Sequence, residues 1–427
     1  MRGWWVRTTP QFLQTRHPRR FFSSPSRVET VAVPCASSGH VTLSLHNVSR
    51  ADPSRPLLIY LPPFFHLGSG SGSGPVLPAF LEPYPTAVIN YRWPESSPDQ
   101  NASAAPRQAY GGPKAASPLH WPTPLHDTLF GYSWIADNLS PPGSGRRDIY
   151  VYGSYLGASL AASLALTECY PHQRMAIRGL VAYNGIYNWT MFLPDHPIHK
   201  SRGLKPLSRE ALETPGSMFH YLKQQMPALF RSPANLFDPF ASSSLLFHNP
   251  GLLIPDDFYP SSLPSSFQRA VDELSLHPLD PDNADSTTPP PSPPRKGYLA
   301  FPPRQSTLRI PETLLLHESP PPIPRPTTAR RRIRTAKKGP VSGEHSFKMQ
   351  AMELAGLMRR SVEKLELKER AKWDPDFEDW DDEVHGRVQV ADVGSADAEA
   401  ELGTRCQGLV AEWLEGRAGT RGGQTGA

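Results

Sequence analysis

One stretch, residues 148–166, restricts the fold of this chain more than any other. It reads DIYVYGSYLGASLAASLAL: an apolar run ends at Gly153, and a segment of alanine, serine and leucine begins shortly after it. Branched and aromatic residues favour a strand, whereas alanine and leucine favour a helix. The two glycines, Gly153 and Gly157, are typical of a tight turn. The segment therefore predicts a buried strand that turns sharply into a helix.

The segments around this turn predict a parallel sheet covered by helices. Residues 55–61, 86–93 and 177–187 are apolar runs typical of strands buried on both faces. Residues 124–139 have apolar residues at helical spacing. Strands and helices thus alternate along the chain, which predicts an α/β fold with a mostly parallel sheet and helices on both faces.

Further elements are expected on either side of this core. They are a β-hairpin at 29–35 and 40–48, a strand within 306–318, a long amphipathic helix at 345–372 with methionines that we expect to pack on the sheet, a strand at 384–393 and a last helix at 399–416. We expect one domain at 29–416. Within it, 188–275 forms a cap region over the sheet, and 276–306 and 320–344 are a low-complexity insert and linker. The tail, 417–427, is expected to be disordered.

The first 28 residues have the composition of a mitochondrial presequence. They hold six arginines and no acid, together with Trp4, Trp5, Phe12 and Leu13 as an apolar face. The segment RRFFSS resembles a matrix-protease site that is cut after Phe22. A disordered basic tail is the alternative interpretation. The composition predicts a protein of the mitochondrial matrix.

At this point the sequence resembles a known family. The segments LLIYLPPF, AVINYRW, PLHDTLFGYSWI and IYVYGSYLGASLA, in this order, are similar to the α/β-hydrolase fold and, within it, to the carboxylesterase and hormone-sensitive-lipase-like branch. The resemblance covers about 29–416 and is sharpest over 55–190. It implies a strand-to-helix nucleophile elbow, G-x-S-x-G, with a serine at its tip, an oxyanion loop, an acid and a histidine.

The elbow departs from that pattern at the nucleophile. If Gly153 and Gly157 are the two glycines, the tip is Tyr155, and Ser154 stands one residue too early. A phenol has a pKa near 10, and a rigid ring holds its oxygen beyond the reach of a serine hydroxyl. We expect Ser154 to be a turn serine that bonds to its own backbone.

The other parts of the active site are mostly missing. Pro62 and Pro63, which have no N–H, stand where the oxyanion loop should begin, and His66 and Gly68 offer only a displaced version of that loop. Glu318 is placed where the acid should follow its strand, although a surface glutamate is an equally good interpretation. His317 is beside it.

No histidine stands where the general base should follow the last strand. The sequence has none after His385, which precedes that strand, and we expect His345 to lie at the opposite edge of the sheet. These losses predict a catalytically inactive protein that binds a protein or small-molecule ligand. The alternative is a serine carboxylesterase that uses Ser154 with His66 or another unusual base.

Other chemistry is not indicated. His196 and His199 have loose metal-like spacing without a carboxylate cluster, which favours a surface loop, and no metal or cofactor is implied. The three cysteines show neither disulfide nor zinc spacing. No apolar run approaches the length of a membrane span, so we expect a soluble protein. Seven basic residues at 325–338 lack interleaved aromatics, and nucleic-acid binding is not expected; they could neutralise the acids of 374–383 instead.

Overall fold

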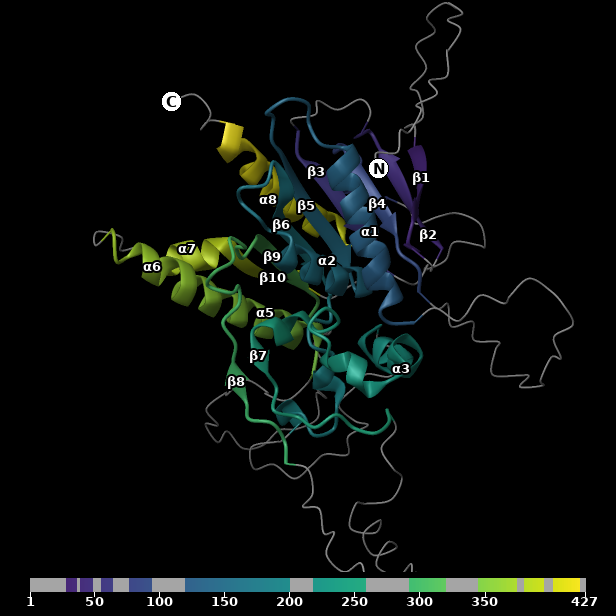
Figure 1. Ribbon diagram of the computed structural model, residues 1–427, viewed down its shortest axis with the longest axis vertical. Helices are drawn as coiled ribbons and strands as arrows, with labels where there is room; N and C mark the ends of the chain where they lie inside the picture. Colours follow the sequence, from purple (N-terminus) through teal and green to yellow (C-terminus); the bar gives the residue numbers. More distant parts are fainter. Residues whose placement is uncertain are drawn as a thin grey trace, which may run out of the picture.

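An eight-stranded sheet forms the centre of the computed structural model (Figure 1). The structure describes residues 28–36, 39–48, 55–63, 77–93, 120–199, 218–258, 292–319, 345–374, 380–394 and 402–422. The strand order is β1-β2-β4-β3-β5-β6-β9-β10. The strands are β1 (Val28–Pro34), β2 (His40–His46), β3 (Leu57–Leu61), β4 (Thr86–Asn90), β5 (Arg147–Ser154), β6 (Met175–Tyr183), β9 (Glu312–His317) and β10 (Val388–Asp392).

The sheet is parallel except at one edge. Strand β2 pairs antiparallel with both β1 and β4, and every later pair, from β4·β3 to β9·β10, is parallel. Every residue of β3 and β6 is buried, as continuous apolar runs covered on both faces require. The predicted α/β class, with a mostly parallel sheet and helices on both faces, is confirmed.

Helices cover both faces of the sheet (Figure 1). Helices α1 (Thr123–Asn138), α2 (Leu156–Thr167) and α5 (Phe347–Ser361) lie on one face, and α8 (Thr404–Gly422) lies on the other. In α8, Trp413 packs edge-on against Tyr150 of β5, with ring centroids 6.1 Å apart. The small residues of α2 allow that helix to lie close to the strands, and eleven of its twelve residues are buried.

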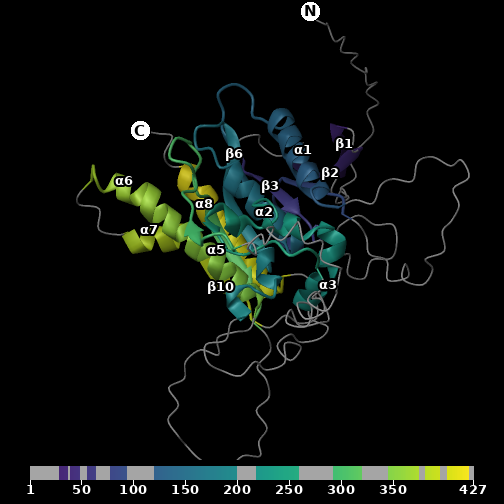
Figure 2. The ribbon, with the colours of Figure 1, turned by 60° about the horizontal axis from the view of Figure 1, so that its bottom comes forward.

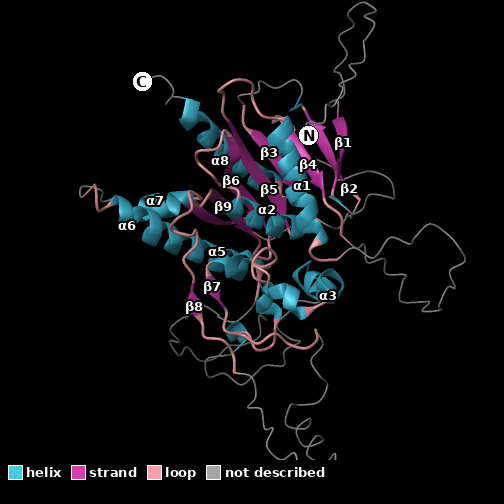
Figure 3. Cartoon of the chain, in the orientation of Figure 1, coloured by secondary structure: helices cyan, strands magenta, loops and turns pink. Residues whose placement is uncertain are grey.

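The cap region consists mainly of loops and short helices (Figure 3). Its described elements are η5 (Trp189–Phe192), η6 (Pro197–His199), α3 (Met218–Phe230), η8 (Pro233–Phe237), η9 (Ser243–Leu246) and β7 (His248–Asn249), which pairs with β8 (Gly297–Tyr298). An aromatic cluster joins the cap to the start of α1. Phe230 of α3 lies 4.9 Å from Trp189 and 5.8 Å from Trp121, measured between ring centroids.

A helical hairpin extends beyond the β10 edge of the sheet (Figures 1 and 2). Helix α5 continues into the π-helix η10 (Val362–Leu367) and α6 (Lys368–Arg370), and α7 (Trp380–Arg387) folds back on them. Arg387 of α7 makes ion pairs with Glu366 of η10 and, at 2.9 Å, with Glu383 of its own helix. These partly buried ion pairs, together with buried Val384, hold the hairpin closed.

Several elements differ from the sequence-based expectation. The strand expected at 384–393 begins only at Val388, because three acids at the start of α7 and Arg387 at its end stabilise the helix dipole through 387. Within 292–306, expected to be low-complexity chain, β8 pairs with β7, and Phe301 packs on Phe247.

The end of the chain and the methionines of α5 also differ. Helix α8 continues past 416 to Gly422, where Arg417 pairs with Glu312 of β9 at 2.6 Å. Met349 and Met352 are exposed, because they lie on the side of α5 opposite to buried Leu354 and Met358. The described residues start at Val28, so the expected presequence lies outside them except for that last residue. The expected linker, 320–344, lies outside them as well.

Candidate functional site: a modified nucleophile elbow

The turn between β5 and α2 has the geometry of a nucleophile elbow. Tyr155 is its tip, with φ 52° and ψ −113°, a conformation that is strained for any residue with a side chain. A Cβ on Gly157 would lie 2.1 Å from the carbonyl oxygen of Leu61, and a Cβ on Gly153 would lie 2.4 Å from the carbonyl oxygen of Gly157. Both positions therefore require glycine.

The side chain of Tyr155 is packed into the molecule. It is 2% exposed, and its ring lies edge-on to Tyr183 of β6 and Phe347 of α5, with both centroid distances 5.7 Å. Phe219 of the cap covers Phe347 in turn, at 5.1 Å. Aromatic rings from the sheet, α5 and the cap thus fill the space over the elbow.

Glu318 lies beside the elbow and accepts hydrogen bonds from two phenols. Its Oε1 accepts from the hydroxyl of Tyr155 at 3.4 Å and, in a shorter bond, from the hydroxyl of Tyr183. Its backbone N–H donates to Oδ1 of Asn184 at 2.9 Å, which fixes the start of the loop after β9. This carboxylate thus has two phenols as side-chain partners.

Both phenols remain protonated donors. Burial, followed by the negative charge of Glu318, raises the pKa of Tyr155. Burial, followed by the neighbouring phenol of Tyr155 and then Glu318, raises the pKa of Tyr183. A phenolate nucleophile at Tyr155 is therefore disfavoured at neutral pH.

Ser154 is not at the tip of the turn. It is the last residue of β5, paired in register with Tyr183, and it is 4% exposed. Successive side chains of a strand point to opposite faces, so Ser154 does not share the direction of its neighbour Tyr155.

The oxyanion side of the site lacks one of its usual donors. The backbone N–H after the tip belongs to Leu156 and is kept, but Pro62 and Pro63 follow β3 and have no N–H to offer. The carbonyl of Pro62 accepts a hydrogen bond from the hydroxyl of Tyr91 at 2.6 Å. His66 and Gly68, the sequence-based candidates for a displaced oxyanion loop, lie outside the described residues.

No histidine that the structure describes is placed as the general base of the elbow. His385 lies in α7, before β10, where its Nδ1 is 2.9 Å from the carbonyl oxygen of Asp381. His317 ends β9 beside Glu318; it is 3% exposed, and burial lowers its pKa. The sequence has no histidine beyond His385.

The expectation that His345 lies at the opposite edge of the sheet is wrong. Helix α5 returns from the carboxyl end of β9, so its first residues lie at the elbow edge, where Phe347 touches Tyr155. His345 is nevertheless enclosed by Phe192 and Phe219, at 4.5 and 4.6 Å between centroids, and its Nε2 is 2.8 Å from Nε2 of Gln350. Burial lowers its pKa well below the usual value, so it stays neutral.

His196 and His199 lie against His345 instead of forming a surface loop. His199 is 6.1 Å from His345 and 6.5 Å from His196 between ring centroids. His196 is 8% exposed, and burial lowers its pKa to about 4. In the described part of the chain, no group of three or more histidine, cysteine, aspartate or glutamate side chains is arranged to hold a metal ion.

The strand order and the strained turn between β5 and α2 decide the fold. The chain has the α/β-hydrolase fold. The residue at the tip of its elbow is tyrosine, Glu318 follows β9 beside it, and no histidine follows β10 in the sequence.

Solved structures similar to the chain include several esterases. An esterase of Pyrobaculum calidifontis matches at 13% identity and a TM-score of 0.45, over 92% of this chain and 86% of that one. Carboxyl esterase 2 of Tuber melanosporum matches at 10% identity and 0.45, over 92% and 88%. An esterase of Rhizomucor miehei matches at 10% and 0.44, over 93% and 84%. No family model and no curated protein sequence matches the chain.

Two features of the site are absent from the sequence-based expectation. One is the second phenol on Glu318, and a signal for it was present: Tyr183 ends a buried apolar strand at the elbow edge, directly before Asn184. The other is Phe347, which a helix returning from the carboxyl end of β9 brings to that same edge.

No helix in the described segments is both long enough and apolar enough to cross a membrane.

Proposed function

We propose that this protein is a catalytically inactive member of the α/β-hydrolase fold that works as a binding or scaffold module. One observation carries the proposal: the elbow tip is a buried tyrosine whose hydroxyl bonds to the acid position, Glu318. In an active hydrolase this acid orients the histidine that deprotonates the nucleophile. Here it accepts hydrogen bonds from Tyr155 and Tyr183 instead.

The filled space over the elbow supports the same proposal. An ester substrate needs room above the tip for its acyl group, and the transition state needs donors for the developing oxyanion. Tyr155, Phe347 and Phe219 occupy that room, and Pro62 and Pro63 supply no donor. Substrate access, proton transfer and oxyanion stabilisation are thus all impaired.

We further propose that the module works in the mitochondrial matrix, with a protein or a small molecule as its partner. The support is the composition of residues 1–28, which hold six arginines and no acid.

An active-site probe tests the loss of catalysis. The full chain is incubated with a fluorophosphonate probe, which labels activated serines covalently, beside an active esterase as positive control. We expect no labelling of the protein. The serine carboxylesterase alternative predicts labelling that disappears in Ser154→Ala and persists in Ser159→Ala, since Ser159 lies one turn into α2 and bonds to the carbonyl of Ile186. That result would overturn the proposal.

A further inference from the structure

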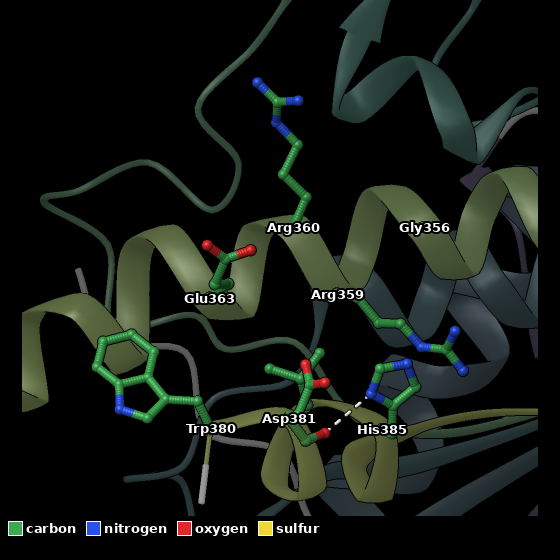
Figure 4. Close-up of a pocket in the computed structure, with 8 residues that line it drawn as sticks. Gly356, Arg359, Arg360, Glu363, Trp380, Asp381 and His385 are labelled. Carbon is green, nitrogen blue, oxygen red and sulfur yellow. Dashed lines mark hydrogen bonds between the residues drawn. The ribbon is translucent and has the colours of Figure 1, made fainter. Parts of the chain in front are cut away.

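A pocket lies between the two arms of the helical hairpin, far along α5 from the elbow. Its volume is about 400 Å3, within the range of small-ligand sites. Helix α5 contributes Gly356 and Arg359 to the lining, η10 contributes Glu363, and α7 contributes Trp380 and His385 (Figure 4). The pocket therefore depends on how α7 folds back over α5.

Arg359 supplies a fixed positive charge in this pocket. Its Nε and Nη2 donate to the carbonyl oxygen of Val388, at 2.9 and 2.7 Å, which holds the guanidinium in one orientation. Among the residues that the structure describes, no carboxylate forms an ion pair with it. Partial burial lowers the pKa of Arg359, as expected for a cation that has lost water without gaining a counter-charge.

The neighbouring Arg360 is oriented differently. Its guanidinium carbon lies 3.5 Å from the ring centroid of Tyr298, and Figure 4 shows the side chain directed away from Arg359 and His385. Of these two arginines, only Arg359 thus directs its positive charge toward His385 in the pocket. The lining also includes His385, whose Nδ1 bonds to the backbone of Asp381, and the carboxylates of Glu363 and Asp381.

The two ends of the pocket differ in chemistry. Figure 4 shows the indole of Trp380 at one end and Arg359 beside His385 at the other. Gly356 lies at the Arg359 end, where it leaves the surface of α5 open, because a Cβ built on it meets no atom within 4 Å. An apolar ring can therefore lie over Gly356 while an anionic group reaches the guanidinium beside it.

We propose that this pocket binds a small organic monocarboxylate with an aromatic ring system, its carboxylate on Arg359 and its ring over Gly356. The planar guanidinium matches a carboxylate in geometry. A peptide with several acids would bring its further charges next to Glu363 and Asp381, which disfavours it. The site is separate from the elbow, so the proposal stands whether or not the elbow is catalytic.

Binding of 2-naphthylacetate to the full chain, followed by isothermal titration calorimetry, tests the proposal. The neutral probe 2-naphthylacetamide has the same ring without the charge. We expect the acid to bind about tenfold or more tightly than the amide, the usual effect of a charged hydrogen bond. In Arg359→Gln the acid should bind only as weakly as the amide, whereas Arg360→Gln should bind both as the unmodified protein does.

A second variant separates loss of binding from loss of folding. Gly356→Leu occupies the open space over α5, where a Cβ meets no atom within 4 Å, and it replaces a glycine inside a helix, so the unfolding temperature should not fall. It should abolish binding of both probes. The proposal is wrong if the unmodified protein binds neither probe at millimolar concentration, if acid and amide bind equally, or if Gly356→Leu binds the acid normally.

Discussion

At the scale of single residues, Tyr155 has the position of a nucleophile and the role of a core residue. Its backbone keeps the strained turn that presents a serine in active hydrolases, yet its ring is buried between Tyr183 and Phe347. The packing of this side chain thus helps to hold the turn. The cost of the strained conformation, about 1–3 kcal/mol, is offset by that burial.

Restoring serine at the tip is therefore expected to cost stability without giving activity. Tyr155→Ser removes a buried ring and should lower the free energy of unfolding by about 2–4 kcal/mol through the cavity that it leaves. Hydrolysis of p-nitrophenyl acetate should stay at the background rate, because none of the described histidines is placed to deprotonate the new hydroxyl and none follows β10 in the sequence.

Urea denaturation and the ester assay check both parts. Tyr155→Phe is the matched control, since it keeps the ring and removes the hydroxyl, which bonds to Glu318 at 3.4 Å; it should cost about 1 kcal/mol. Rapid ester hydrolysis by Tyr155→Ser would show that a competent base exists near the elbow.

At the scale of elements, the cap is joined to α5 by a buried polar contact. Gln350 of α5 accepts hydrogen bonds from the backbone N–H groups of Tyr187 and Asn188, and its amide nitrogen is 2.8 Å from His345. His196 and His199 lie beside this contact on the cap side. Neutral imidazoles are thus part of the interface that keeps the cap on the helix.

This interface should make stability depend on pH. Burial lowers the pKa of His196 to about 4 and that of His345 well below its usual value, whereas both groups titrate near 6.5 in the unfolded chain. The unfolded state therefore binds more protons below pH 6.5. The stability that comes from keeping these histidines neutral is complete above that pH. On acidification below it, the free energy of unfolding should fall by up to about 1.4 kcal/mol per pH unit for each histidine.

Urea denaturation between pH 7.5 and 5.5, where ordinary carboxylates stay ionised, measures this slope. His345→Gln removes one of the titrating groups and should flatten the slope, whatever its effect on stability at pH 7.5. His126→Gln, at an exposed position of α1, should leave the slope unchanged. An equal slope in all three proteins would contradict a buried, neutral His345.

At the scale of the whole molecule, charge is distributed unevenly. The chain has a formal net charge of +4, but its first 28 residues hold six arginines, so the remainder is slightly acidic. A basic segment of this kind responds to the membrane potential of mitochondria, whereas the rest of the chain gives no general attraction to polyanions.

A reporter fusion tests the proposed targeting. Residues 1–22 placed before a fluorescent protein should carry it into mitochondria, and the triple change Arg16→Glu, Arg19→Glu and Arg20→Glu should leave it in the cytosol. Fluorescence microscopy with a mitochondrial dye gives the readout, and the reporter alone is the control. A reporter that stays cytosolic with the unchanged segment would refute the targeting proposal.

Local patterns in the sequence determined the order of the elements, the α/β class and the position of the elbow. Buried strands such as β3 and β6 are continuous apolar runs, and Gly153 and Gly157 mark the turn, so periodicity and turn chemistry suffice to find them. The lack of a histidine after His385 is likewise a property of the sequence alone.

Only the tertiary structure decided which side chains meet at that turn. Tyr155 and Glu318 are 163 positions apart, and Phe347 reaches the elbow because α5 returns from the carboxyl end of β9. Such contacts depend on how whole elements pack, a property that neither periodicity nor composition records. The same reason explains why His345 and His196, interpreted from their neighbours in sequence, were misplaced: burial is determined by the cap and helix that close over them.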